Sequence, residues 1–110
     1  MKLNILGTEY TVVFDVLEEN MPIDADGCVD QSVKLIKIAK MEQERNSLMD
    51  LESYKKKVLR HEIIHAFLYE SGLWNNSHET TAWATDEEIV DWFAIQSPKI
   101  IEVFKAAECL

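Results

Sequence analysis

The chain has 110 residues, of which 47% are apolar, and this length predicts one small domain with a hydrophobic core. Eleven Lys and Arg against 20 Asp and Glu give a formal net charge of −9, which opposes the phosphate backbone and argues against nucleic-acid binding. No apolar run approaches the roughly twenty residues that cross a bilayer. The apolar run at the start of the sequence is too short for a signal peptide. We therefore expect a cytoplasmic protein that binds no membrane.

The first forty residues carry strand patterns. Residues 2–6 and 10–16 are rich in β-formers and flank Gly-Thr-Glu at 7–9, which predicts a β-hairpin. Residues 24–27 predict a turn, with its aspartates as turn residues and Gly27 in the left-handed position. Apolar residues alternate over 32–39, which predicts a third strand. We expect this strand to form a sheet edge that can pair with an extended peptide.

A long helix is predicted next. Ser47 and Asp50 resemble a capping box, no Gly or Pro follows before Ser71, and Gly72 is well placed to end the helix. Apolar side chains cover most of its circumference, which predicts a buried helix. They are Leu59, Ile63, Ile64, Ala66, Phe67 and Leu68.

His61-Glu62-Ile63-Ile64-His65 is an HExxH motif inside this apolar helix. Because four residues make just over one turn, both imidazoles leave the same face and can bind one metal ion. Zinc suits two neutral imidazoles with a carboxylate and an open position for water. Glu62 lies about 100° around the helix from His61, where it reaches a bound water rather than the metal. The alternative without a metal is a pair of hydrogen-bonded core histidines.

The last third of the chain is predicted to hold a loop and two helices. Residues 74–84 are polar and turn-rich, a helix follows from about 87 to 96, and Pro98 fits the first turn of a last helix that reaches about residue 108. The third zinc ligand is expected from the first of these helices. Leu68 and Ser71 stand where a metzincin has its Gly and third His, which excludes that class.

A family resemblance rests on the motif helix and on the residues that follow it. Glu87-x-x-Val90-Asp91-x-Phe93-Ala94 resembles the E-x-x-A-[ND]-x-F-A signature that follows HExxH in the ImmA/IrrE-like metallopeptidases. These are compact zincins common in mobile elements and phages. The resemblance spans roughly residues 30–98. It implies that residues 1–110 form one α+β, zincin-like domain, with a small sheet on a central HExxH helix followed by a glutamate-bearing helix and a C-terminal helix.

The resemblance also implies a function, a zinc-dependent metallopeptidase that hydrolyses a peptide or protein substrate. His61, His65 and Glu87 would hold Zn²⁺, and Glu62 would be the general base. Asp91 would orient a ligand histidine. An alternative function is a catalytically silent, phage-type zinc protein that binds a host or phage protein. A phage-encoded protein of either kind would act in the host-cell cytoplasm.

Some assignments stay open at this point. Glu88 is the alternative to Glu87 as third ligand, because the sequence does not exclude a slip of one residue. Tyr69 is either an oxyanion donor or an ordinary amphipathic residue, and His78 is either a transition-state donor or an exposed loop histidine. Arg60 departs from the family, which usually has an uncharged residue before the motif. We ascribe the basic cluster of residues 55–57 with Arg60 to a solvated helix face.

Overall fold

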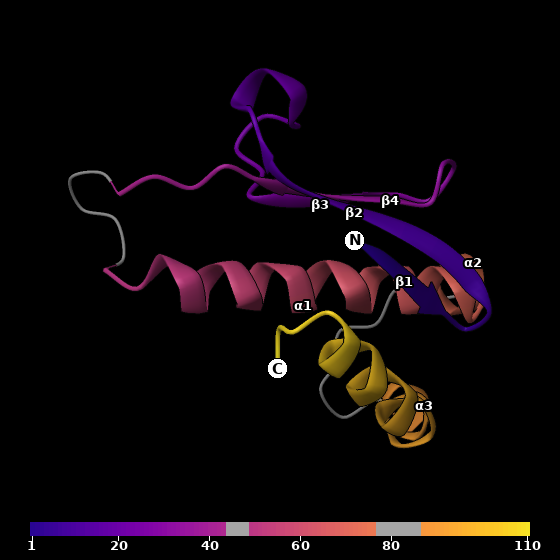
Figure 1. The fold of residues 1–110 in the computed structure, drawn as a ribbon. Coiled ribbons are helices and arrows are strands. Elements are labelled where there is room, and N and C mark those ends of the chain that lie inside the picture. Colours follow the sequence, from indigo (N-terminus) through magenta and orange to yellow (C-terminus); the bar gives the residue numbers. More distant parts are fainter. Residues whose placement is uncertain (44–48, 77–86) are drawn as a thin grey trace.

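The computed structural model describes residues 1–43, 49–76 and 87–110, and Figure 1 shows a four-stranded sheet lying on one side of a long helix. The sheet is mixed: its order is β1-β2-β4-β3, and only the β2–β4 pair is parallel. This confirms the predicted α+β class. The strands are β1 (Lys2–Ile5), β2 (Thr8–Val16), β3 (Gly27–Asp30) and β4 (Leu35–Ala39), with a short 3₁₀ helix, η1 (Glu18–Asn20), after β2.

The predicted hairpin is confirmed, with a tighter turn than expected. β1 and β2 pair antiparallel, and Ile5 lies opposite Thr8. The two residues between them, Leu6 and Gly7, have φ angles of 52° and 91°. Two positive φ angles match the right-handed twist of paired strands, so a two-residue turn is favoured here.

The expected third strand has a different place in the sheet. It is β4, shorter than predicted, and it lies between β2 and β3. The prediction of a peptide-binding edge at residues 32–39 is therefore wrong. β3 was not predicted from the sequence, because its four residues include Gly27 and Asp30, which are poor strand formers. The left-handed residue of the preceding turn is Asp24, with φ 58°, and not Gly27 as predicted.

The HExxH helix, α1 (Leu51–Glu70), begins later than predicted. Asp50 is its N-cap, and one of its carboxylate oxygens accepts a 3.0 Å hydrogen bond from the backbone N–H of Ser53. Ser47 lies outside the described residues. The predicted end is confirmed, because Ser71 caps the helix and Gly72 follows with φ 83°.

Only one side of α1 is buried, which corrects the prediction of a helix buried all round. The covered residues face the sheet and α3 (Glu87–Ala106). They are Val58, Leu59, Glu62, Ile63, Ala66 and Phe67. Ile64 and Leu68 are half-buried instead, and His61 is exposed.

The C-terminal third differs from the prediction in two ways. Residues 73–76, part of which was expected as loop, form the short helix α2 (Leu73–Asn76), and residues 77–84 with His78 lie outside the described residues. The two predicted helices are a single helix, α3, with Pro98 in its interior. Proline removes one backbone donor and disturbs a helix, yet tertiary packing overrides this cost when residues on both sides join the same core. Trp92 and Ile100 do so here.

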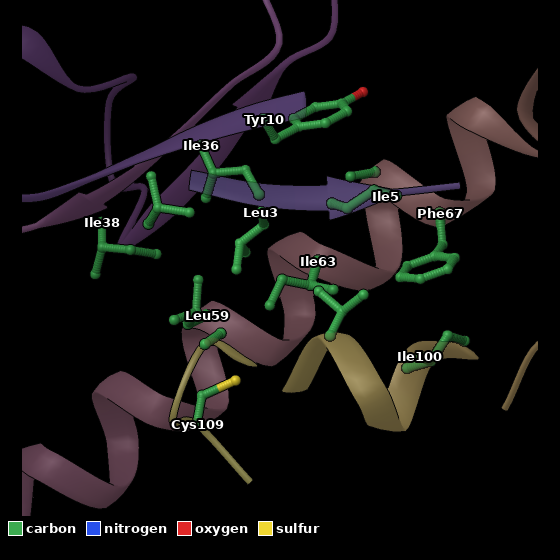
Figure 2. Close-up of a cluster of buried hydrophobic side chains, with 14 of the residues drawn as sticks. Leu3, Ile5, Tyr10, Ile36, Ile38, Leu59, Ile63, Phe67, Ile100 and Cys109 are labelled. Atoms are coloured by element: carbon green, nitrogen blue, oxygen red, sulfur yellow. The ribbon is translucent and has the colours of Figure 1, made fainter. Parts of the chain in front are cut away.

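The core lies between the sheet, α1 and the second half of α3, as Figure 2 shows. Leu3, Ile36 and Ile38 of the sheet face the side of α1 that carries Leu59 and Ile63, while Ile100 and Cys109 lie on the opposite side. Each large apolar side chain buried in this way stabilises the fold by about 1.5–3 kcal/mol. The sheet and α3 therefore hold α1 firmly along one side.

A charged cluster fixes the C-terminal end of α1 to the sheet. The carboxylate of Glu70 accepts hydrogen bonds from Thr8 Oγ1 at 3.0 Å, Tyr10 Oη at 2.7 Å and Lys34 Nζ at 2.7 Å. Burial alone would raise the pKa of Glu70, but these donors and the charge of Lys34 together lower it.

In the described part of the chain, no helix is both long and apolar enough to span a membrane.

Candidate metal centre

His61 and His65 lie one turn apart on the open side of α1. Their Nε2 atoms form a 3.0 Å hydrogen bond, as the alternative without a metal expects, and the ring centroids are 4.6 Å apart. His61 is exposed and His65 half-buried, so they are not core histidines. Helical spacing brings the two imidazoles together, as the motif predicts.

The surroundings of His65 favour a neutral imidazole. Burial lowers its pKa, and the neighbouring His61 lowers it further. Its Nδ1 atom is buried and has no hydrogen-bond partner among the described residues. A ligating histidine usually donates a hydrogen bond from its second ring nitrogen, so this orphaned atom needs an acceptor in a complete site. Trp74 of α2 covers His65 edge-on, with ring centroids 6.0 Å apart.

Glu62 is the one charged residue of the described chain that is fully buried, with 6% of its surface exposed. Burial raises the pKa of its carboxyl, and the charge of His61 partly opposes this rise. Glu62 faces the sheet side of α1, whereas the histidines face outward. The motif thus presents two imidazole nitrogens beside a carboxyl group with a strengthened affinity for a proton.

The beginning of β3 approaches Glu62 very closely. A Cβ atom at position 27 would lie 2.9 Å from Glu62 Cγ and 2.7 Å from Val58 Cγ1. Because Gly27 has no Cβ, the side chain of Glu62 fits at this place. This role differs from the turn role predicted for Gly27. The sequence gives no local signal for it, because it arises from two segments separated by more than thirty residues.

A pocket of about 300 Å³ opens beside His61 and Glu62. Its walls come from the residue before β3, from the first residue of β3 and from the first and middle turns of α1. Asp26, Gly27, Tyr54, Lys57, Val58, His61 and Glu62 line it. Asp26, Tyr54 and Lys57 were not predicted as site residues. Tyr54 and Val58 precede His61 by about two turns and one turn, so helical spacing alone places them on neighbouring faces of the helix.

The histidine pair fits the geometry of zinc ligands. Two nitrogens bound tetrahedrally at about 2.0–2.1 Å from Zn²⁺ lie about 3.3 Å apart, close to the observed 3.0 Å. The third ligand is not assembled. Across residues 1–43, 49–76 and 87–110, no three His, Cys, Asp or Glu side chains are grouped to hold a metal ion.

The expected third ligands lie in the first turn of α3. Glu87 and Glu88 are both exposed, as is Asp91, and none of them joins the histidine pair. Trp92 marks the side of α3 that faces α1, because its indole Nε1 donates a 3.1 Å hydrogen bond to Ser71 Oγ. At about 100° per residue, Glu88 lies about 40° from Trp92 and Glu87 about 140°. The choice between Glu87 and Glu88 therefore stays a prediction.

The remaining candidates have defined surroundings. The ring of Tyr69 is half-buried and lies 4.8 Å from Lys34 Nζ, a cation–π contact. Arg60 Nη1 donates a 2.6 Å hydrogen bond to the backbone carbonyl of Cys109. The residue that departs from the family pattern thus fastens the C-terminal segment to α1.

No family model, curated protein or solved structure matches this chain. Its function is therefore proposed from its own residues and from the resemblance of its motifs.

Proposed function

We propose that this protein is a zinc-dependent metallopeptidase whose centre lies on the open side of α1. The observation that carries the proposal is the convergence of His61 Nε2 and His65 Nε2 at 3.0 Å beside the buried carboxyl of Glu62. Two imidazoles on the open side of a helix, next to a buried acid, are the arrangement that metal-assisted hydrolysis needs. A purely structural histidine pair has no need of a desolvated carboxyl beside it.

In this proposal His61, His65 and Glu87 hold the metal, with Glu88 as the alternative third ligand. Zinc, when bound, lowers the pKa of a water ligand and polarises a peptide carbonyl. Glu62 accepts the proton of the attacking water and later delivers it to the leaving amine. Burial raises the pKa of Glu62, which favours the protonated form that this second step uses.

The substrate is a peptide or protein, and β3 offers a place for it. β3 pairs with β4 on one side, and no described strand pairs with its other side. An extended peptide that hydrogen-bonds to β3 would pass beside the pocket at Gly27 and Glu62. This edge replaces the one expected at residues 32–39.

The test measures zinc content and peptide cleavage on the same preparations. Wild-type protein should carry about one zinc per chain when purified without added metal or chelator, and His65→Ala should lose it. Glu62→Gln keeps the shape of the side chain but removes its proton affinity. We expect it to retain zinc and to lose cleavage of a mixed-sequence peptide pool by at least about 10²-fold.

Each other outcome contradicts a stated part of the proposal. Absence of zinc after purification and after added Zn²⁺ would overturn the metal centre. Zinc binding without cleavage by the wild type would leave the alternative, a silent zinc protein that acts by binding. Wild-type cleavage by Glu62→Gln would overturn the role of Glu62 alone.

A further inference from the structure

The pocket beside Glu62 holds two carboxyl groups whose hydrogen-bonding capacity the fold leaves partly unused. Asp26 Oδ2 accepts a hydrogen bond from Tyr54 Oη, whereas Asp26 Oδ1 accepts none from the residues that the structure describes. Glu62 is buried and lines the same pocket, and it also accepts no hydrogen bond from a described residue. A carboxylate only accepts hydrogen bonds, so a ligand of this pocket has to donate them. In the proposed reaction the attacking water is the partner of Glu62, which leaves Asp26 for the ligand.

The surroundings of Asp26 favour a cationic ligand. A second pocket, of about 370 Å³, adjoins the first, since Asp26 lines both of them. Its walls add the carboxylates of Glu18 and Asp24. Lys40 also lines it, but its Nζ lies 3.2 Å from Glu42 Oε1, so this positive charge is already paired. The region therefore has the same negative sign as the whole chain, which attracts cations.

Lys57 is the positive charge among the described residues that line the first pocket. It is exposed, so solvent screens its charge. Its Nζ lies 5.7 Å from the centroid of the Tyr54 ring, which shows that a cation can approach this ring. Tyr54 precedes His61 by about 10 Å along the helix axis, and the apolar side chain of Val58 lies between them. A long methylene stem that ends in a charged group fits such a wall.

β3 and α1 run in the same direction, and this decides which part of a substrate meets the pocket. Asp26, just before β3, contacts Tyr54 near the start of α1, whereas Lys34, after β3, lies 2.7 Å from Glu70 Oε1 at the end of α1. A peptide that pairs with the edge of β3 in the antiparallel sense, which is the commoner pairing, runs opposite to α1. The residues that follow the scissile bond therefore lie beyond His61, toward Tyr54 and Asp26.

We propose that this pocket binds a lysine or arginine side chain of the substrate, from the residue that directly follows the scissile bond, with Asp26 as its ionic partner and the Tyr54 ring beside it. Water adds across the scissile bond, giving a carboxylate on the preceding residue and a free amine on the basic residue. Asp26 is then a specificity-determining residue, which selects the substrate and takes no part in the chemistry. This inference rests on the proposed peptidase function.

The test maps cleavage sites by mass spectrometry after a pool of mixed-sequence peptides is digested with the zinc-loaded protein. The readout is the frequency of Lys and Arg directly after the cleaved bond, compared with Ala and Ser. We expect an enrichment of about fivefold with the wild type, as one partly exposed ion pair provides. Asp26→Asn keeps the shape of the side chain and an acceptor for Tyr54 but removes the charge, so it should abolish the enrichment. Lys57→Gln removes the opposing charge and should increase it.

Asp24→Asn is the matched control, because it makes the same change of charge in a residue that lines the second pocket and not the first. Asparagine also tolerates the positive φ angle of 58° at this position. This variant should keep the enrichment. Absence of enrichment with the wild type, or enrichment that survives Asp26→Asn, would overturn the inference while the peptidase function stands.

A binding measurement separates this inference from a failure of the peptidase function. If no peptide is cleaved, the peptidase function fails, and fluorescence anisotropy then compares two fluorescein-labelled peptides that differ only in one Arg or Gln. Tighter binding of the Arg peptide that Asp26→Asn removes and Asp24→Asn retains would still support the pocket. Absence of both cleavage and such binding overturns both proposals.

Discussion

The side chain of Glu62 lies so close to the backbone of Gly27 that only a glycine fits at position 27. The Cβ of any other residue there would lie 2.7 Å from Val58 Cγ1, 2.9 Å from Glu62 Cγ and 3.0 Å from Glu62 Oε1. Carbon atoms at their best separation are about 3.5–4.0 Å apart, so both Val58 and Glu62 would have to move. The start of the edge strand therefore sets the position of the proposed general base.

Gly27→Ala should lower peptide cleavage more than it lowers zinc content. The added methyl group displaces Glu62, while His61 and His65 keep their places on the outer side of α1. We expect kcat to fall at least about tenfold and the free energy of unfolding to fall by about 1–3 kcal/mol, the usual cost of overpacking. Metal analysis, steady-state kinetics and urea unfolding measure the three effects.

Gly7→Ala is the matched control for this variant. Gly7 has φ 91° and no atom within 4 Å of an added Cβ, so the substitution strains the hairpin turn without touching the site. It should lower stability by about 1 kcal/mol and leave kcat unchanged. A Gly27→Ala protein that keeps wild-type kcat would show that Glu62 does not depend on this contact.

Separate substitution of the two glutamates at the start of α3 should identify the third ligand. The family resemblance assigns Glu87, whereas the orientation of α3 turns Glu88 closer to the Trp92 side. We expect Glu87→Gln to weaken zinc affinity by at least about 10-fold, as loss of a ligand does, and Glu88→Gln to leave it unchanged. Competition with a chelating dye measures both affinities. The reverse pattern would make Glu88 the ligand, and no effect from either variant would remove α3 from the centre.

Local patterns predicted the main elements of this fold. The hairpin, the α1 helix and the Gly72 stop each depend on neighbouring residues, and each is confirmed. Pro98 led to a wrong prediction, because a local rule places a helix boundary at proline, whereas the packing of Ile100 against the core continues this helix. The position of β4 inside the sheet could not be predicted from the sequence either, because strand order depends on long-range pairing with β2 and β3.

One part of the candidate site could be predicted from local spacing, and the other part depends on long-range contacts. The His61–His65 pair follows from spacing along one helix, so the motif was sufficient to predict it. Tyr54 contacts Asp26 across 28 positions of sequence, and Gly27 meets Glu62 across a similar separation. The helix and strand periodicity of the sequence does not predict such contacts. The pocket therefore became visible only with the fold.

Glu70→Gln should destabilise the fold in a way that depends on pH. The donors Thr8, Tyr10 and Lys34 surround the carboxylate of Glu70, whose side chain is 13% exposed, and its pKa lies below the ordinary value of 4.5. The folded chain therefore holds a proton at Glu70 less readily than the unfolded chain. This contribution to stability is fully present above about pH 4.5 and is lost as the pH falls through the lowered pKa.

At pH 7 the wild type should exceed Glu70→Gln by about 1–3 kcal/mol in the free energy of unfolding, because hydrogen bonds to a charged group are lost. The difference should shrink as the pH falls from 5 to 3. Urea unfolding of both proteins across this range measures it, and the other acids cancel because both proteins contain them. A difference that stays constant down to pH 3 would mean that the charge of Glu70 does not stabilise the joint between α1 and the sheet.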